Sequence, residues 1–490
     1  MPSEQSIPLE ALRRIRIFES LEEKHLLAHQ WEVLLDKFYV HLPLKESLLG
    51  LNLVQRVRRL QEQAALYPDD SAFMAALLQL STALRDFHTM VDMPEPWSRY
   101  TALLPFQLHE YFDDAGAARY IVGELAPGVE LGGDFRRGVE VTHWNGEPIA
   151  HKLTCLAKQT AGSNPEAQKR RALALLTQRI LRFYLPPDED FVLVTYLGKT
   201  GPADIKLPWR VQETPQTGRW AAVPALVSVP ESLAFRSVET LSGTLGYLRI
   251  ASFMINDVDG FVREVQRIIR SLPQAGLIID VRGNPGGSIF AAERILQFFT
   301  PNRIEPEPVS LRCTDLTLKL CESGEGWAPW RASLWQGLTT GELFSQGFPL
   351  TPVEQANDVG QLYKGPVVLL CDALSYSATD FFIAGFKDHN IGKIMGVDRQ
   401  TGAGGASMYR HQQLVSTWAN EPASPLKPLI RGVAMRVALM RSTRVGAKRG
   451  MPVEGLGAEI DIPYRYTRDD ILHGDVDLLN RAGQLLDSRP

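Results

Sequence analysis

Two segments of the chain follow one plan, in which a continuous apolar run leads through a turn of small residues into a helix. The first reads GLIIDVRGNPGGSIFAAERILQFF and the second reads GPVVLLCDALSYSATDFFIAGFKD. Short apolar runs bounded by turn residues predict buried strands, and strands that alternate with helices predict a layered α/β domain. We therefore predict an α/β core over residues 219–490.

The turns of these two units are where chemistry is expected. Ser377 lies at the second strand-to-helix turn, where a side chain is exposed and the helix N-terminus favours negative charge. In the first turn, Gly286 and Gly287 allow the backbone to approach a ligand closely. Their amides, together with the amide of Ala378, are predicted to form an oxyanion hole. The alternative interpretation is that Ser375 or Ser377 is only a helix N-cap.

Length and composition indicate an ordinary globular protein of several domains. The 490 residues exceed one compact core, while 44% hydrophobic and 22% charged residues are typical values. A net charge of −4 and scattered Lys and Arg give no reason to expect nucleic acid. No apolar run is long enough to span a bilayer, and the first residues do not resemble a signal peptide. A cytoplasmic location is the simplest expectation.

No metal and no cofactor are expected from the sequence. The four cysteines are far apart and show neither metal-ligand spacing nor a disulfide framework. His25 and His29 are one helical turn apart, but the stretch HLLAH lacks the glutamate of the zinc-protease motif HExxH. These two histidines are therefore predicted to lie on an ordinary helix face.

The N-terminal part, residues 1–110, is predicted to be helical. The stretch SAFMAALLQLSTALRDFHT places Phe73, Leu77 and Leu84 on one apolar stripe, and His88 one turn further along that stripe. A histidine in such a place is more often a hydrogen-bonded core residue than a catalyst.

Residues 111–218 are predicted to form a strand-rich domain with a helical insertion. GVEVTHWNGEPI is an alternating strand closed by a tight turn at Asn145-Gly146, and DFVLVTYLGKTGPADIKLPWRV is a hairpin. An amphipathic helix, PEAQKRRALALLTQRILRFYL, lies between them. This order resembles a PDZ domain, which holds an extended peptide at a sheet edge. A plain small β-rich domain is the alternative.

A long segment within the core, residues 314–364, contains Trp327, Trp330 and Trp335. A segment of this length in a compact domain is often a lid or a binding loop. The alternative is that the tryptophans pack against the core.

The two strand-turn-helix units together resemble the tail-specific, or C-terminal-processing, serine peptidase superfamily, which includes the tricorn core and interphotoreceptor retinoid-binding protein. The closing GMPVEGLGAEIDIPYRY is similar to the ending of that family, and LRDFHT resembles the L-x-D-G-H-T of its tricorn-like branch. The resemblance implies a core of the Clp protease and crotonase type. It also implies a peptidase that acts on a protein or peptide substrate.

The resemblance implies a role for each of several residues. Ser377 matches the nucleophile, while the Gly286 pair and Ala378 match the oxyanion donors. Many family members use a lysine base, but the stretch RQTGAGG stands in its place here. The tricorn-like branch uses a histidine base oriented by a glutamate, and His88 and Glu454 match these two positions.

The chain also departs from the tricorn-like pattern. Phe87 stands where a serine beside the histidine is expected, so Thr89 would have to link His88 to Glu454, or the linkage differs. Lys387 and Lys393 are expected to be solvated. Ala378 replaces an aspartate that favours basic substrates, so no such preference is inferred.

A serine endopeptidase is therefore the predicted function, because Ser377, His88, Glu454 and the glycine pair occur together. The missing lysine supports an alternative, a catalytically inactive homologue that binds peptides or hydrophobic ligands. An acyl-CoA enzyme of the crotonase type is a third interpretation, which requires neither the serine nor the PDZ-like module.

Overall fold

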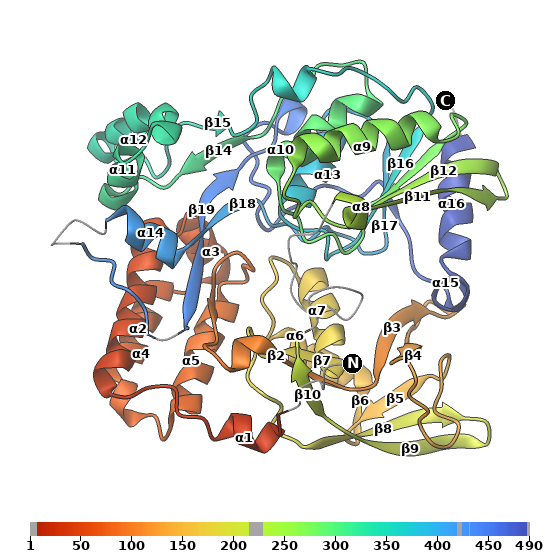
Figure 1. The fold of residues 1–490 in the computed structure, drawn as a ribbon, viewed down its shortest axis with the longest axis horizontal. Coiled ribbons are helices and arrows are strands. Elements are labelled where there is room, and N and C mark those ends of the chain that lie inside the picture. Colours follow the sequence, from red (N-terminus) through yellow and green to blue (C-terminus); the bar gives the residue numbers. More distant parts are fainter. Residues whose placement is uncertain (1–6, 215–228, 419–423, 431, 488–490) are drawn as a thin grey trace.

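A computed structural model describes residues 7–214, 229–418, 424–430 and 432–487 (Figure 1). The domain boundary predicted at residue 218 falls outside these ranges. Helices from the N-terminal part, drawn in red and orange, lie beside a strand-rich middle part drawn in yellow. The α/β core, drawn in green to blue, lies across both of them.

The central sheet of the core has six strands, and its parallel strands confirm the predicted α/β alternation. The order is β11 (Leu233–Thr240), β12 (Gly243–Ile250), β13 (Leu277–Asp280), β16 (Val367–Cys371), β17 (Lys393–Gly396) and β20 (Ile462–Pro463). From β12 to β20 neighbouring strands are parallel, and β11 is an antiparallel edge strand.

Helices cover both faces of this sheet, which explains why every residue of β13 and β16 is buried. On one face lie α9 (Val258–Ser271), α10 (Ile289–Arg294) and α13 (Ala378–Asp388), and on the other α16 (Val476–Asp487), preceded by α15 (Arg468–His473). Because β13 and β16 are parallel neighbours, the turns that follow them meet at the same edge of the sheet.

The N-terminal helices are joined to the core by a second sheet. They are α1 (Leu9–Arg13), α2 (Leu21–Val33), α3 (Leu42–Leu49), α4 (Leu53–Glu62) and α5 (Asp70–Ala83). The strand that follows, β1 (Met90–Asp92), pairs antiparallel with β19 (Ala434–Ser442). The same sheet contains β14 (Pro308–Leu311), β15 (Phe348–Pro349) and β18 (Ala406–Arg410), which leads into α14 (His411–Thr417).

The expectation that His88 continues the apolar stripe of the helix is wrong. Helix α5 ends at Ala83, and Arg85 has a positive φ of 51°, which turns the chain away from the helix axis. His88 therefore lies in the turn between α5 and β1, where the pairing of β1 with β19 holds it against the core.

The middle part is built from short antiparallel sheets and two helices. Its elements are β2 (Tyr100–Leu103), β3 (Phe106–Phe112), β4 (Ala118–Leu125), β5 (Val141–Trp144), β6 (Glu147–Pro148), α6 (Ile149–Ala157), α7 (Pro165–Thr177), β7 (Gln178–Ile180), β8 (Phe191–Gly198), β9 (Gly201–Pro208) and β10 (Arg210–Glu213). The predicted tight turn is confirmed, with positive φ at Asn145 and Gly146. The predicted hairpin is β8 with β9.

The tryptophan-containing segment is helical rather than an irregular loop. It forms α11 (Asp315–Glu322) and α12 (Ala328–Thr340). Trp330 is buried and donates a hydrogen bond from Nε1 to the carbonyl of Val309 (2.9 Å), while Trp335 is 64% exposed. Helix α12 therefore packs through one tryptophan and presents another to solvent. Among the described residues, no helix combines the length and the apolar character needed to cross a membrane.

Candidate active site

Ser377 lies in a strained turn between β16 and α13. Its backbone has φ 60° and ψ −125°, a conformation that non-glycine residues rarely adopt and that recurs at functional sites. Its half-buried side chain makes no capping hydrogen bond to α13, and Ser375 donates instead to the carbonyl of Val281 (2.9 Å). The N-cap interpretation of these serines is therefore wrong.

The glycine turn after β13 lies directly against the Ser377 turn. A Cβ atom placed on Gly286 would lie 2.6 Å from Cβ of Ser377 and 2.8 Å from the amide nitrogen of Ala378. A Cβ atom on Gly287 would lie 2.1 Å from the backbone of Phe253. Since both glycines also have positive φ (95° and 136°), no other residue fits this close approach without strain.

The structure brings the three predicted oxyanion donors together, but their amides differ in whether they already donate a hydrogen bond within the protein. The Gly286 amide donates to Oδ1 of Asn284 (2.9 Å). Within the described ranges, no group accepts a hydrogen bond from the amides of Gly287 or Ala378. These two amides are the ones placed to donate to a ligand beside Ser377.

His88 packs against the residue that precedes Ser377. Its ring stacks on the ring of Tyr376, with centroids 4.6 Å apart and an angle of 28° between the planes. Its amide donates to Oδ1 of Asp86 (2.8 Å), which fixes the turn. The side chain is 8% exposed, and burial lowers the pKa of His88 to about 4, although the charges of Asp86 and Glu454 oppose this. His88 is therefore neutral at pH 7.

Two buried carboxylates gather around the His88 ring. Asp86, His88 and Glu454 each offer an atom within 4.8 Å of the other two, and Nδ1 of His88 lies 3.8 Å from Oδ1 of Asp86. No hydrogen bond joins the described side chains of His88 and Ser377. Thr89 donates to Oδ2 of Asp86 (2.9 Å) rather than to Glu454, so the linkage around His88 runs through Asp86.

A buried lysine from the N-terminal helices contacts Glu454. Lys45, on α3, is 1% exposed and donates from Nζ to Oε1 of Glu454 (2.5 Å) and to the carbonyl of Arg85 (2.9 Å). Burial raises the pKa of Glu454, and the Lys45 ammonium opposes that rise. The site therefore contains a lysine, but this lysine binds the carboxylate and makes no hydrogen bond to Ser377.

The side chains of Asp86, His88 and Glu454 are spaced closely enough to hold a metal ion. The ammonium of Lys45, 2.5 Å from Oε1 of Glu454, acts against this, because a second cation there would be repelled in a buried environment. The arrangement fits an ion pair beside a neutral histidine better than a metal centre.

The loop at residues 401–404 connects the Ser377 and Glu454 parts of the site. Asp380, fully buried on α13, accepts hydrogen bonds from Oγ1 of Thr401 (2.6 Å) and from the amides of Ala403 (3.1 Å) and Gly404 (2.8 Å). Burial raises the pKa of Asp380 to about 7, and these donors oppose the rise. The carbonyl of Ala403 then accepts from the amide of Gly455 (2.9 Å), so the loop ties the Ser377 helix to the Glu454 turn.

The two lysines near this loop lie outside the site. Lys387 forms an ion pair with Asp461 and is only partly exposed, so the expectation of a solvated side chain is wrong for it. Lys393 is exposed at the start of β17, as expected. Neither side chain contacts Ser377.

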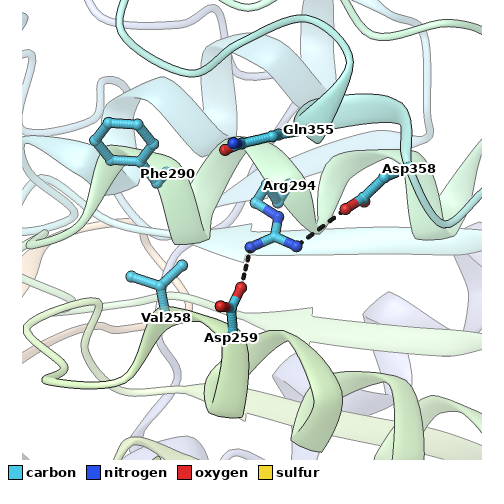
Figure 2. A pocket seen from close by; sticks show the side chains of 6 residues that line it. All are labelled: Val258, Asp259, Phe290, Arg294, Gln355 and Asp358. Carbon is cyan, nitrogen blue, oxygen red and sulfur yellow. Dashed lines mark hydrogen bonds and ion pairs between the residues drawn. The ribbon is translucent and has the colours of Figure 1, made fainter.

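A surface pocket of about 400 Å³ lies between the first turn of α9 and helix α10 (Figure 2). Its central side chain, Arg294, pairs with Asp259 (2.6 Å) and Asp358 (3.1 Å). None of the predicted site residues lines this pocket.

Sequence reasoning missed Asp86 and Lys45. Asp86 is the aspartate of LRDFHT, the motif that also carries His88, and that motif was its only signal. Lys45 has no comparable signal, because it lies 409 residues from Glu454 and belongs to an ordinary helix.

Part of the chain is similar in sequence to known peptidases. Residues 244–419 match the sequence model of peptidase family S41. A stretch of 72 residues is 33% identical to "Carboxy-terminal processing protease CtpB" of Bacillus subtilis (strain 168), over 14% of this chain and 15% of that protein. The alignment thus spans a small part of this curated relative.

Solved structures extend the similarity of fold to nearly the whole chain. Mature CPAF complexed with lactacystin has a TM-score of 0.71 at 19% identity, over 96% of this chain and 99% of that one. A second structure of mature CPAF gives the same values. With the matched S41 region and the paired strand-to-helix turns, this chain resembles the tail-specific, or C-terminal-processing, serine peptidase superfamily over residues 244–419.

Proposed function

We propose that this chain is a serine endopeptidase that hydrolyses peptide bonds of protein or peptide substrates through an acyl-enzyme on Ser377. The observation that carries the proposal is the strained Ser377 turn, which faces the amides of Gly287 and Ala378. A helix cap needs neither the strain nor the two adjacent amides.

In the proposed reaction, Oγ of Ser377 attacks the substrate carbonyl carbon and its proton passes to His88. The nitrogen that takes the proton is Nε2, because Nδ1 is buried and faces Asp86. The amides of Gly287 and Ala378 donate to the oxyanion, and losing one such donor typically costs about 3–4 kcal/mol of transition-state stabilisation. His88 then gives the proton to the leaving amine, and water hydrolyses the ester by the same steps.

The carboxylates support the charge that forms on His88. The ring is neutral before the reaction and carries a proton during it. Glu454 orients and stabilises this imidazolium, and Asp86, 3.8 Å from Nδ1, adds a second negative charge. The ion pair with Lys45 opposes the rise in the pKa of Glu454 that burial causes, and so favours the ionised carboxylate.

The domain roles belong to the same proposal. The helices α1 to α5 and strand β1 form the part that supplies His88. The predicted boundary at residue 110 falls inside β3, and β2 and β3 pair with strands of the middle part, so the PDZ-like part that captures a substrate tail begins at β2. What supports delivery to the core is the position of α7. Its N-cap residue Asn164 donates to the carbonyl of Thr401 (2.8 Å), and Arg170 pairs with Asp398 (2.9 Å).

The alternative function is an inactive homologue that binds peptides or hydrophobic ligands. The missing hydrogen bond between His88 and Ser377 favours it. In free enzymes, however, catalytic hydrogen bonds are often long and tighten only when substrate binds.

Labelling with a fluorophosphonate probe, read by intact mass, tests the proposed function. The expected result is one adduct on the wild-type protein and none on Ser377→Ala, because only an activated serine reacts. Ser375→Ala is the matched control and should still be labelled. Absence of an adduct on folded wild-type protein would favour the binding protein instead.

Replacing Gly286 with alanine is expected to lower the rate of peptide hydrolysis by about 100-fold or more, since a misplaced catalytic group is costly. The added Cβ would lie 2.6 Å from Cβ of Ser377 and would displace the nucleophile. Gly283→Ala is the control, because Gly283 also has positive φ but has open space around it. Its effect should be limited to about 1–2 kcal/mol of stability. Equal losses of activity in the two variants would contradict the close approach.

A further inference from the structure

Arg171 is a partly buried cation that forms no ion pair with the residues the structure describes. It lies on α7, and its Nε is buried without a hydrogen bond. Within the described parts of the chain, no carboxylate pairs with it. The adjacent Arg170, in contrast, pairs with Asp398 (2.9 Å), and Arg294 pairs with two carboxylates (Figure 2). Arg441 likewise has a buried Nε without a hydrogen bond, but it stacks on the Phe344 ring, with Cζ 3.6 Å from the ring centroid.

The unpaired guanidinium lies next to the proposed catalytic residues. Its carbon Cζ is 3.9 Å from the centroid of the Phe87 ring and 5.7 Å from that of the Tyr376 ring. Phe87 directly precedes His88, and Tyr376 directly precedes Ser377. The positive charge is therefore one residue away from both the proposed base and the proposed nucleophile.

A second arginine makes this region more positive. Cζ of Arg436 is 5.1 Å from the same Phe87 ring, and its own partner, Asp92, is 3.7 Å away. Burial lowers the pKa of Arg171, and the charge of Arg436 adds to that effect, whereas Tyr184, Tyr376 and Asp372 oppose it. Stacking on an aromatic ring stabilises a cation but does not neutralise it. An anion placed here would therefore be bound favourably.

We propose that Arg171 binds a carboxylate of the substrate beside the scissile bond, so that the enzyme prefers acidic peptides. This inference rests on the proposed peptidase function. A guanidinium is suited to the role because it binds a carboxylate through two parallel hydrogen bonds. The carboxylate belongs either to an Asp or Glu side chain or to the free C-terminus of the substrate, and these two sources share the same chemistry.

The test compares kcat/KM for matched peptides in the wild-type protein and its variants. One pair of peptides differs by Glu or Gln near the scissile bond, and another by a free or amidated C-terminus. The wild type should favour the charged member of one pair by about 10–100-fold, as charge-assisted hydrogen bonds do. The pair that shows the preference identifies the source of the carboxylate.

In Arg171→Gln the ratio between charged and neutral peptides should fall to near one. Arg171→Lys should retain part of the preference, and Arg171→Glu should reverse it in favour of a Lys-containing peptide. Arg210→Gln, which removes an exposed arginine of the same part of the chain, should leave both activity and preference unchanged.

Fluorophosphonate labelling of the same variants separates the two proposals. Two outcomes would overturn the carboxylate site and leave the peptidase intact. In one, the wild-type protein is labelled but shows no preference for charged peptides. In the other, Arg171→Gln is labelled and keeps the wild-type preference. An absence of labelling in the wild-type protein would overturn the peptidase, and the carboxylate site with it.

Discussion

Replacing His88 with alanine is expected to lower kcat/KM for peptide hydrolysis by about 10⁴–10⁶-fold, in the range found when a serine peptidase loses its histidine. The reason is that Ser377 would lose the group that accepts its proton. The folded state should persist, because the shortened side chain leaves the pairing of β1 with β19 in place. Steady-state hydrolysis and the rate of fluorophosphonate inactivation both measure the effect.

The control for this variant is His151→Ala, which removes an exposed histidine on α6 and should leave the rate unchanged. A loss of less than about tenfold in His88→Ala would exclude His88 as the base.

The pH dependence of the wild-type rate of fluorophosphonate inactivation follows from the burial of His88. The pKa of His88 is lowered to about 4, and only the neutral ring can accept a proton. The inactivation rate should therefore rise as the pH increases through about 4 and should be level between pH 6 and 8. A limb near the ordinary histidine value of about 6.5 would show that the ring is solvated in the active form.

Replacing Lys45 with methionine is expected to reduce both stability and activity. Glu454 would remain buried without a counter-charge, and breaking a buried ion pair typically costs about 3–5 kcal/mol. Because Glu454 would then become protonated more readily, it would no longer stabilise the His88 imidazolium. We expect kcat/KM to fall by about 100-fold or more, corresponding to at least about 2.7 kcal/mol.

A second substitution separates these two effects of Lys45. In Lys45→Met with Glu454→Gln, both charges are removed, so urea unfolding should show much of the stability restored, whereas activity should remain low. Lys45→Arg should recover part of the activity. As a control, Lys448→Met breaks the exposed pair with Glu459 and should cost less than about 1 kcal/mol. If Lys45→Met lost as little stability as Lys448→Met, the proposed role of Lys45 in positioning Glu454 would be contradicted.

The sequence predicts those parts of the fold that depend on neighbouring residues. The buried strands β13 and β16, the turn at Asn145-Gly146 and the β8–β9 hairpin all follow from local patterns and turn chemistry. The position of His88 did not follow, because the positive φ at Arg85 ends the helical register that the apolar stripe suggested.

The remaining parts of the site depend on contacts between distant segments. Lys45 meets Glu454 across 409 residues, and Arg171 reaches the Tyr376 ring from a helix in another part of the chain. Hydrophobic periodicity identifies a helix face but does not show which segment will cover it. Only the motif LRDFHT pointed to Asp86, and it did so through its resemblance to a family.

The wide separation of these residues also sets the moment at which activity can begin. Lys45 and His88 are made before Glu454, and the ribosome must add 409 residues after Lys45 before Glu454 exists. At typical rates of about 5–20 residues per second, that interval lasts about 20–80 s. Strand β19 must also be present before β1 can pair, so the proposed catalytic residues cannot come together during this interval. For the proposed peptidase, proteolytic activity therefore cannot begin before Glu454 has been made.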